Sequence, residues 1–235
     1  MDTRFRNRMH AGRLLAGKLA VYANRPDVVV LALPRGGVPV GFEVATALNA
    51  TLDVFLVRKL GVPGHQELAM GAIATGDVRV LNEEVISYLG ISEDAIAAVA
   101  AAEQRELERR TMEYRGTRPP QHLNGRTVIV VDDGLATGST MHAAVDAIRK
   151  QHPARIVVAV PVAPLSTCHD FESIADEIAC VMVPQHLDGI GAWYQDFSQT
   201  SDEEVRFLLR EAEALRPSPH LGPWAEKPAA RRKEA

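Results

Sequence analysis

Cysteine and aromatic residues are scarce in this chain. Only Cys168 and Cys180 occur among 235 residues, and Phe, Tyr and Trp together make up 5%. The two cysteines form no CxxC pair, the spacing that redox motifs and many zinc sites use. We therefore expect reduced, partly buried thiols, which are typical of a cytoplasmic protein.

An excess of positive charge and a long apolar run are also missing. Lys and Arg number 26 against 30 Asp and Glu, which gives a formal charge of −4. A mildly acidic chain is a poor generic nucleic-acid binder, although a local basic patch stays compatible with it. No stretch reaches the roughly 18 apolar residues that a membrane span needs. The basic N-terminus, residues 1–20, lacks the apolar core of a secretory signal, and its Leu and Ala spacing predicts a surface helix.

Two common nucleotide-binding motifs are absent as well. No GxGxxG follows a predicted strand, and no Gly-Lys-Ser/Thr loop of the P-loop type occurs. There is no internal repeat of 20–50 residues. A dinucleotide fold, a P-loop enzyme and a solenoid are therefore disfavoured.

What the chain does have is an alternation of short apolar runs and helical patterns. Gly76-Asp77 predicts a hairpin turn within 69–82, and residues 83–115 form a helical insertion in two pieces, broken near Gly90 and capped by Ser92. The other predicted strands are 28–33, 52–60, 127–132, 155–163 and 177–183, and the other predicted helices are 38–50, 139–151, 166–176 and 202–215, the last capped by Ser201 or Asp202. Alternating strands and helices with near-continuous Val/Ile runs predict an α/β fold with an open, mainly parallel twisted sheet flanked by helices. We expect one domain over 1–216 and a disordered, proline-containing tail over 217–235.

The stretch "VIVVDDGLATGST" at 128–140 is the most informative. A buried strand ends on Asp132 and Asp133, and a loop of small and hydroxyl residues then opens a helix. Ligands of parallel sheets bind beyond the carboxyl ends of strands. The loop amides and the helix N-terminus favour a phosphate, while the two carboxylates can accept hydroxyl groups. A ribose 5-phosphate fits both demands, and a divalent cation would offset the remaining charge.

This stretch closely resembles the ribose-phosphate signature of type I phosphoribosyltransferases. The resemblance implies that fold, with a small hood, and an Mg²⁺-dependent transfer of ribose 5-phosphate from 5-phosphoribosyl 1-diphosphate to a nitrogenous acceptor, with release of diphosphate. It implies no direct protein ligand for the metal, unless Asp132 and Asp133 reach it through water or substrate. The residues that would hold the ribose 5-phosphate are Asp132, Asp133, Ala136, Thr137, Gly138, Ser139 and Thr140.

Two further segments are similar to the diphosphate-binding parts of that family. "ALPRGGVPVG" (32–41) ends the first strand, and its Arg35, Gly36 and Gly37 match the diphosphate loop, where the family has a strained or cis peptide. Arg58 and Lys59 at the end of the second predicted strand match a basic pair that reaches the diphosphate. The resemblance thus implies catalytic roles for Asp132, Asp133, Arg58 and Lys59. The alternative for residues 32–41 is an ordinary strand-to-helix turn, and the alternative for Arg58 and Lys59 is a pair of solvated charges at a strand end.

Residues 61–76 occupy the place of the family's mobile catalytic loop, in which His65 and Glu67 are acid–base candidates or surface residues. This segment, the N-terminal helix and 193–205 also resemble predicted bacterial phosphoribosyltransferases of unassigned acceptor. Trp193, Tyr194 and Phe197 either stack on an acceptor base or form a packed aromatic cluster.

The family resemblance leaves the acceptor open. Ala136 stands where hypoxanthine-guanine enzymes carry an aspartate, so transfer to oxo-purines with a loop carboxylate as base loses support. A non-catalytic sensor of nucleotides or ribosyl diphosphate, and a hydrolase or phosphorylase of ribose phosphates, are alternatives. The expected partners are small molecules, without nucleic acid or membrane, and a homodimer is compatible with the resemblance.

Overall fold

The centre of the protein is a five-stranded parallel sheet. The computed structural model describes residues 4–215, apart from the side chains of Gln66 and Glu67. The sheet has the order β2-β1-β6-β7-β8, and neighbouring strands are parallel throughout. Its strands are β1 (Val28–Ala32), β2 (Thr51–Val54), β6 (Thr127–Val131), β7 (Arg155–Val162) and β8 (Glu177–Met182). The predicted α/β fold with an open parallel sheet is therefore confirmed.

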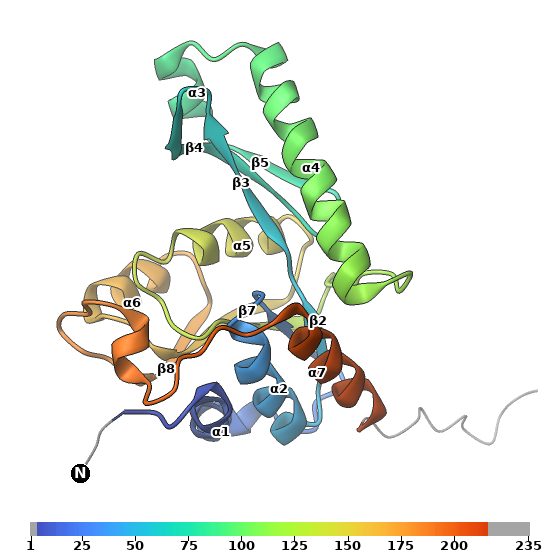
Figure 1. Ribbon diagram of the computed structural model, residues 1–235, viewed down its shortest axis with the longest axis vertical. Coiled ribbons are helices and arrows are strands. Elements are labelled where there is room, and N and C mark those ends of the chain that lie inside the picture. Colours follow the sequence, from blue (N-terminus) through green and yellow to red (C-terminus); the bar gives the residue numbers. More distant parts are fainter. Residues whose placement is uncertain (1–3, 216–235) are drawn as a thin grey trace, which may run out of the picture.

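Helices cover both faces of this sheet (Figure 1). α1 (Arg8–Lys18) and α2 (Gly37–Leu48) pack on one face, and α5 (Ser139–Arg149) and α6 (Leu165–Glu172) pack on the other. Side chains alternate along each strand, so Val28 and Val30 face the first pair of helices, while Val29 and Leu31 face the second. All five residues of β1 and of β6 are buried, which explains their nearly unbroken Val/Ile sequences.

A second unit, which we call the arm (residues 57–115), rises from one side of the body (Figure 1). It consists of the antiparallel strands β3 (Val57–Val62), β4 (His65–Ala74) and β5 (Val78–Leu81), followed by α3 (Glu83–Leu89) and α4 (Glu93–Arg115). Gly76 and Asp77 form the β4–β5 turn, both with positive φ. Gly90 ends α3 in the left-handed conformation and Ser92 caps α4. These three predicted features are confirmed.

Two predictions in this region are wrong. The single strand predicted over 52–60 is two strands in different sheets: the Phe55 amide still donates to Ala32 O (3.0 Å), and the Leu56 amide already donates to Thr75 Oγ1 (3.0 Å) in the arm. Residues 61–76 are mostly strand β4 rather than a loop. Residues 71–74 of β4 pair with both β3 and β5, so their backbone groups are satisfied as in a central strand, whereas the outer part of β4 pairs with β3 alone.

A buried ion pair ties the base of the arm to the body. Arg115, the last residue of α4, donates from Nε and Nη2 to the two oxygens of Asp53 (3.2 and 2.9 Å), and also to Val54 O (2.9 Å). The side chains of Arg115 and Asp53 are only 3% and 9% exposed. A two-pronged contact of this kind fixes orientation as well as distance, so α4 ends at a defined place on β2.

The last described helix, α7 (Asp202–Ala214), packs against α2, α4 and β2. It buries Val205, Leu208, Leu209 and Ala212, one stripe of its surface, and Ser201 caps it by accepting from the Glu204 amide (3.1 Å). The tail predicted to be disordered, 217–235, lies outside the described residues. Within residues 4–215, none of the helices has the length and apolar character needed to cross a bilayer.

Candidate functional site

The strand order reverses between β1 and β6, and the candidate site lies at that point. The connection after β1 leads through α2 to β2 on one side, whereas the connection after β6 leads through α5 to β7 on the other. Such a switch point opens a crevice at the carboxyl ends of the two strands. Ala32 and Val131 are register partners, so the loop 33–37 and Asp132–Asp133 emerge side by side. The sequence-predicted diphosphate loop and acidic pair are thus brought together.

Each aspartate of the pair has one oxygen bound within the protein and one without a partner. Asp132 Oδ1 accepts from the Asp133 amide (2.8 Å), and Asp133 Oδ2 accepts from Arg8 Nε (2.8 Å). Asp132 Oδ2 and Asp133 Oδ1 accept no hydrogen bond from any described residue. No partnerless side-chain oxygen in residues 4–215 is fully buried, so both of these oxygens reach solvent. Two free acceptors on adjacent carboxylates can receive two neighbouring hydroxyl groups.

The glycines of the 33–37 loop let it lie directly on the bound side of this pair. A Cβ on Gly36 would come within 2.0 Å of Asp133 Oδ2, and one on Gly37 would come within 2.9 Å of the Asp132 Cα. No side chain larger than hydrogen fits at either place. The peptide between Pro34 and Arg35 in this loop is cis, as the resemblance implied. The loop therefore covers the bound oxygens and leaves the free ones facing outward.

Next to Asp132, the loop 134–138 and the start of α5 surround a pocket of about 170 Å³. The backbone amides of residues 136–141 donate no hydrogen bond within the described part of the chain. Gly138, with φ of 69°, turns the chain into α5. The pocket is lined by Asp132, Gly134, Leu135, Ala136, Thr137, Gly138, Ser139, Thr140, Met141 and Ile190. Free amides converging at a helix N-terminus form a strong binding site for a phosphate group.

The electrostatics of the acidic pair favour a ligand that donates hydrogen bonds. Burial, and then the charge of Asp133, hold the pKa of Asp132 well above its usual value. Burial also raises the pKa of Asp133, although the hydrogen bond from Arg8 acts in the opposite direction. Ionising two adjacent, largely buried carboxylates together is costly. Hydroxyl donors or a cation would lower that cost by stabilising the ionised form.

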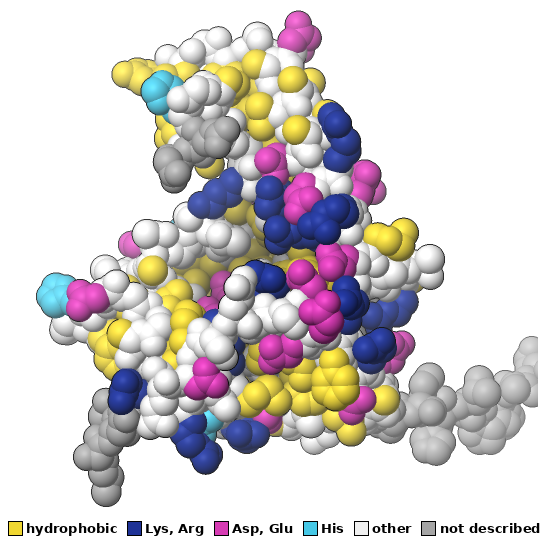
Figure 2. All heavy atoms as spheres, in the orientation of Figure 1, with side chains coloured by type: hydrophobic (Ala, Val, Ile, Leu, Met, Phe, Trp, Pro, Cys, Tyr) yellow, Lys and Arg dark blue, Asp and Glu magenta, His cyan; other side chains and the backbone are white. Residues whose placement is uncertain are grey.

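The two basic residues predicted to act as a pair diverge, because neighbours on a strand project to opposite faces. Lys59 donates to Ser139 Oγ and so reaches the phosphate pocket. Arg58 instead pairs with Glu103 of α4 (2.7 Å). Arg35 lies 3.7 Å from the carboxylate of Asp202 at the start of α7. Lys and Arg side chains gather where the arm meets the body (Figure 2).

A larger cavity, of about 700 Å³, lies between the arm and α5. It is lined by Lys59, by the β4 and β5 residues Ala69, Gly71, Ala72, Val80 and Leu81, by residues 82–84, and by Ser139, His142, Ala143 and Asp146 of α5. Ser139 lines both this cavity and the phosphate pocket, so the two adjoin.

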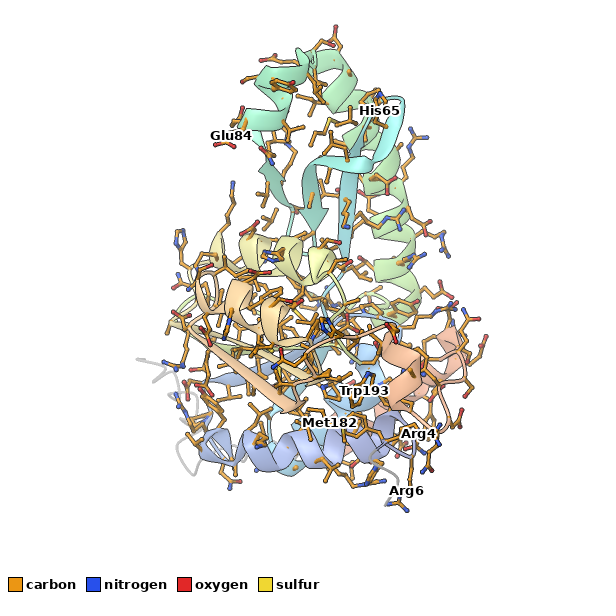
Figure 3. All side chains as sticks on the ribbon, turned by 90° about the vertical axis from the view of Figure 1, so that its left-hand side faces the viewer. Arg4, Arg6, His65, Glu84, Met182 and Trp193 are labelled. Atoms are coloured by element: carbon orange, nitrogen blue, oxygen red, sulfur yellow. The ribbon has the colours of Figure 1, made fainter. Side chains whose placement is uncertain are left out.

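The acid–base candidates of the predicted loop are not gathered at this site. His65 is exposed at the far end of the arm, well away from the body (Figure 3). The side chain of Glu67 is not among those described. His65 therefore has no contact with the acidic pair in this conformation.

The aromatic residues of the hood segment (residues 183–201) are mostly used for packing. Tyr194 is 3% exposed, lies between the rings of Phe5 (5.2 Å) and Phe197 (5.0 Å), and donates from its hydroxyl to Asp133 O (2.6 Å). Trp193 is half-buried on the same cluster, beside Met182 (Figure 3). For Tyr194 and Phe197, the packed alternative is the one the structure shows.

Arg8 is the site residue that the sequence did not reveal. It begins α1, yet its guanidinium reaches Asp133, 125 positions along the chain. The segment "RFRNRMH" offers four basic side chains, and no spacing rule distinguishes the one that will turn inward.

Comparisons with known proteins agree with this geometry. The phosphoribosyl transferase domain family matches residues 6–182. Two Mycobacterium tuberculosis proteins, each named "Putative phosphoribosyl transferase" (Rv0571c of strain H37Rv and MT0597 of strain CDC 1551), are 45% identical over 208 residues, which is 88% of this chain and 47% of theirs. The chain thus spans about half the length of these curated relatives. The crystal structure of TT1426 from Thermus thermophilus is 43% identical, with a TM-score of 0.80 over 88% of this chain and 98% of that one. The chain therefore belongs to the phosphoribosyl transferase domain family.

Proposed function

We propose that this protein binds 5-phosphoribosyl 1-diphosphate with Mg²⁺ and transfers the ribose 5-phosphate to a nitrogenous acceptor, releasing diphosphate. One observation carries the proposal: two free carboxylate oxygens, on Asp132 and Asp133, stand beside a pocket of free backbone amides at the switch point. Vicinal hydroxyls and a phosphate on one small molecule match that pair of features. Membership of the family supports the same substrate.

The residues divide the substrate among them. Asp132 and Asp133 accept the ribose hydroxyls, and residues 136–140 hold the 5-phosphate with their amides and with the hydroxyls of Thr137, Ser139 and Thr140. Gly36 and Gly37 bring the loop backbone close to the acidic pair. Arg35 and Lys59 neutralise the charge of the diphosphate. Arg58 would contribute only if its side chain left the ion pair with Glu103 and bound the diphosphate instead.

In the reaction the bond from ribose C1 to the diphosphate oxygen breaks, and the acceptor nitrogen forms a bond to C1. The diphosphate leaves with the bonding electron pair, so the sugar becomes cationic and the leaving group gains charge. Arg35 and Lys59 stabilise that developing negative charge. Electrostatic stabilisation of this kind usually makes the largest single contribution to the rate enhancement of an enzyme. Exclusion of water protects the cationic sugar from hydrolysis.

The acidic pair fits a magnesium ion that arrives with the substrate. Residues 4–215 contain no cluster of three or more His, Cys, Asp or Glu side chains that could hold a metal alone. Mg²⁺ commonly keeps several waters and uses one or two carboxylates together with substrate phosphates. Asp132 Oδ2 and Asp133 Oδ1 would contact it through water, and the bound ion would neutralise charge on the diphosphate.

We place the acceptor in the 700 Å³ cavity between the arm and α5. Tyr194 and Phe197 are committed to packing, so they are not free to stack on a base. The cavity adjoins the phosphate pocket at Ser139 and has the size and mixed lining of a small-molecule site. The arm would then contribute both the wall of the acceptor site and, through Lys59, a contact to the phosphorylated substrate.

We further propose that the described residues form one phosphoribosyltransferase domain, with the arm helices as an insertion, that acts on small molecules in the cytoplasm. The free thiols of Cys168 and Cys180 accord with that compartment.

Diphosphate release from 5-phosphoribosyl 1-diphosphate and Mg²⁺, with and without a panel of nitrogenous bases, tests the function. We expect release that depends on one class of base. Release without any base would indicate a hydrolase, and binding without release would indicate a sensor; either result would contradict the proposed transfer.

A further inference from the structure

Arg8 is held on three sides at the edge of the site. Its Nε donates to Asp133 Oδ2 (2.8 Å), and its Nη1 donates to Ser198 O (2.6 Å). Its guanidinium carbon lies 3.9 Å from the centre of the Phe197 ring. The Arg8 side chain is 12% exposed, as is that of Asp133. A guanidinium can make all three contacts at once because it is planar and has several donors.

These contacts form a closed ring of interactions, which we call the circuit, between the acidic pair and the hood segment. Arg8 joins Asp133 to Phe197 and Ser198; Phe197 packs on Tyr194; and the Tyr194 hydroxyl donates back to Asp133 O (2.6 Å). Asp133 is therefore fixed through both its side chain and its backbone. Within residues 4–215, Arg13 on the same helix pairs with Glu43 at the surface, and its side chain is 54% exposed.

The circuit decides which oxygen of Asp133 is available. The terminal torsion of an aspartate has a broad preference, so an unheld carboxylate would turn freely between orientations. Arg8 holds Oδ2 on the side covered by Gly36, and Oδ1 is left accessible. Asp132 is oriented by the amide of Asp133 and has no direct bond to Arg8 among the described residues.

We propose that Arg8 is a positioning residue that presents Asp133 Oδ1 to the ribose 2-hydroxyl and so sets the preference for ribose over 2-deoxyribose. The inference rests on the proposed function, because it requires a ribose phosphate at the acidic pair. Arg8 acts through Asp133 and does not itself touch the substrate. The hood segment is held in place by the same guanidinium, so its position and the hydroxyl preference are linked.

The test compares the binding of ribose 5-phosphate and 2-deoxyribose 5-phosphate by calorimetry. The wild type should bind the ribose form about tenfold more tightly, as expected for a hydroxyl bound to a charged acceptor. Arg8→Gln should reduce this ratio to about twofold or less, because the Asp133 carboxylate is no longer oriented. Arg8→Lys keeps the charge and one donor, so its ratio should lie between the two. Arg13→Gln, which removes the same charge from the same helix, should keep the wild-type ratio.

A purely structural role for Arg8 would weaken both ligands equally. An unchanged tenfold ratio in Arg8→Gln and Arg8→Lys would therefore overturn the inference. If a thermal melt shows that Arg8→Gln does not fold, the affinity ratio of Arg8→Lys is used in its place. A wild-type ratio in Arg8→Lys would then contradict the positioning role of Arg8. A ratio of one in the wild type would overturn the proposed ribose site and this inference together, so the two failures are distinguishable.

Discussion

Replacing Gly36 by alanine adds one methyl group at the tightest contact of the site. The backbone of Gly36 is right-handed (φ −61°, ψ −31°), so alanine meets no conformational penalty there. The new Cβ would lie 2.0 Å from Asp133 Oδ2, 2.6 Å from its Cγ and 3.2 Å from Arg8 Nε. Carbon and oxygen cannot approach so closely, so the Asp133 carboxylate must turn away and lose its bond to Arg8.

The lost bond sets the size of the effect. A hydrogen bond to a charged group contributes about 1.5–3 kcal/mol, so we expect Gly36→Ala to lower the free energy of unfolding by roughly 2 kcal/mol. For a domain of this size that corresponds to a fall in Tm of about 4–8 °C. Affinity for 5-phosphoribosyl 1-diphosphate should fall by at least about tenfold, because the free oxygen of Asp133 is displaced as well.

Thermal melts and calorimetric titration measure both effects, and Gly17 supplies the control. Gly17 lies in α1 with nothing within 4 Å of an added Cβ. Gly17→Ala should stabilise the protein by about 0.5–1 kcal/mol through helix propensity alone, with no change in affinity. A Gly36→Ala protein with the Tm and affinity of the wild type would refute the close packing of the two loops.

Three further predictions concern single residues. Arg115→Leu removes the ion-pair partner of the buried Asp53, whose Oδ1 still accepts from the Val54 amide, so urea unfolding should show a loss of about 3–5 kcal/mol. The pKa of Asp132 is raised by folding, so its contribution to stability is full below the unfolded pKa near 3.8 and declines as pH rises toward the folded pKa. The margin by which Asp132→Asn melts above the wild type should therefore grow as pH rises above the unfolded pKa, and a constant difference would contradict this. Lys59→Met should leave the melt within about 0.5 kcal/mol of the wild type but weaken binding of 5-phosphoribosyl 1-diphosphate about tenfold; equal affinity would remove Lys59 from the site.

The sequence predicted the main sheet well because its signals are local. Four β-branched or apolar runs each became one strand of the main sheet, the run 52–60 supplied the fifth strand in its first part, and caps such as Ser92 and Ser201 act where the pattern placed them. The carboxyl-end rule predicted a ligand site at the acidic pair, and the family resemblance added the glycine loop to the same site. Their meeting at the switch point follows from the topology.

Features that depend on contacts distant in the chain were not predictable in this way. The run 52–60 contains no breaker at Phe55–Leu56, yet the chain changes sheets there, because Leu56 finds its partner in Thr75 of the arm. The approach of Arg8 to Asp133 likewise joins two ends of the fold. Strand alternation separates Arg58 from Lys59, which a sequence motif treats as a unit.

Calorimetric titration of 5-phosphoribosyl 1-diphosphate and Mg²⁺ into the wild type and Asp132→Asn tests the central claim most directly. Asparagine keeps the Oδ1 that accepts from the Asp133 amide and replaces the free Oδ2 by an NH₂ group, so the fold should persist while a ribose hydroxyl loses its acceptor. Asp170→Asn, on the exposed surface of α6, is the control. We predict saturable binding to the wild type and the control, and a loss of about tenfold to hundredfold in Asp132→Asn. Equal affinity in all three proteins, or no binding to the wild type, would contradict the assignment of this acidic pair to the ribose.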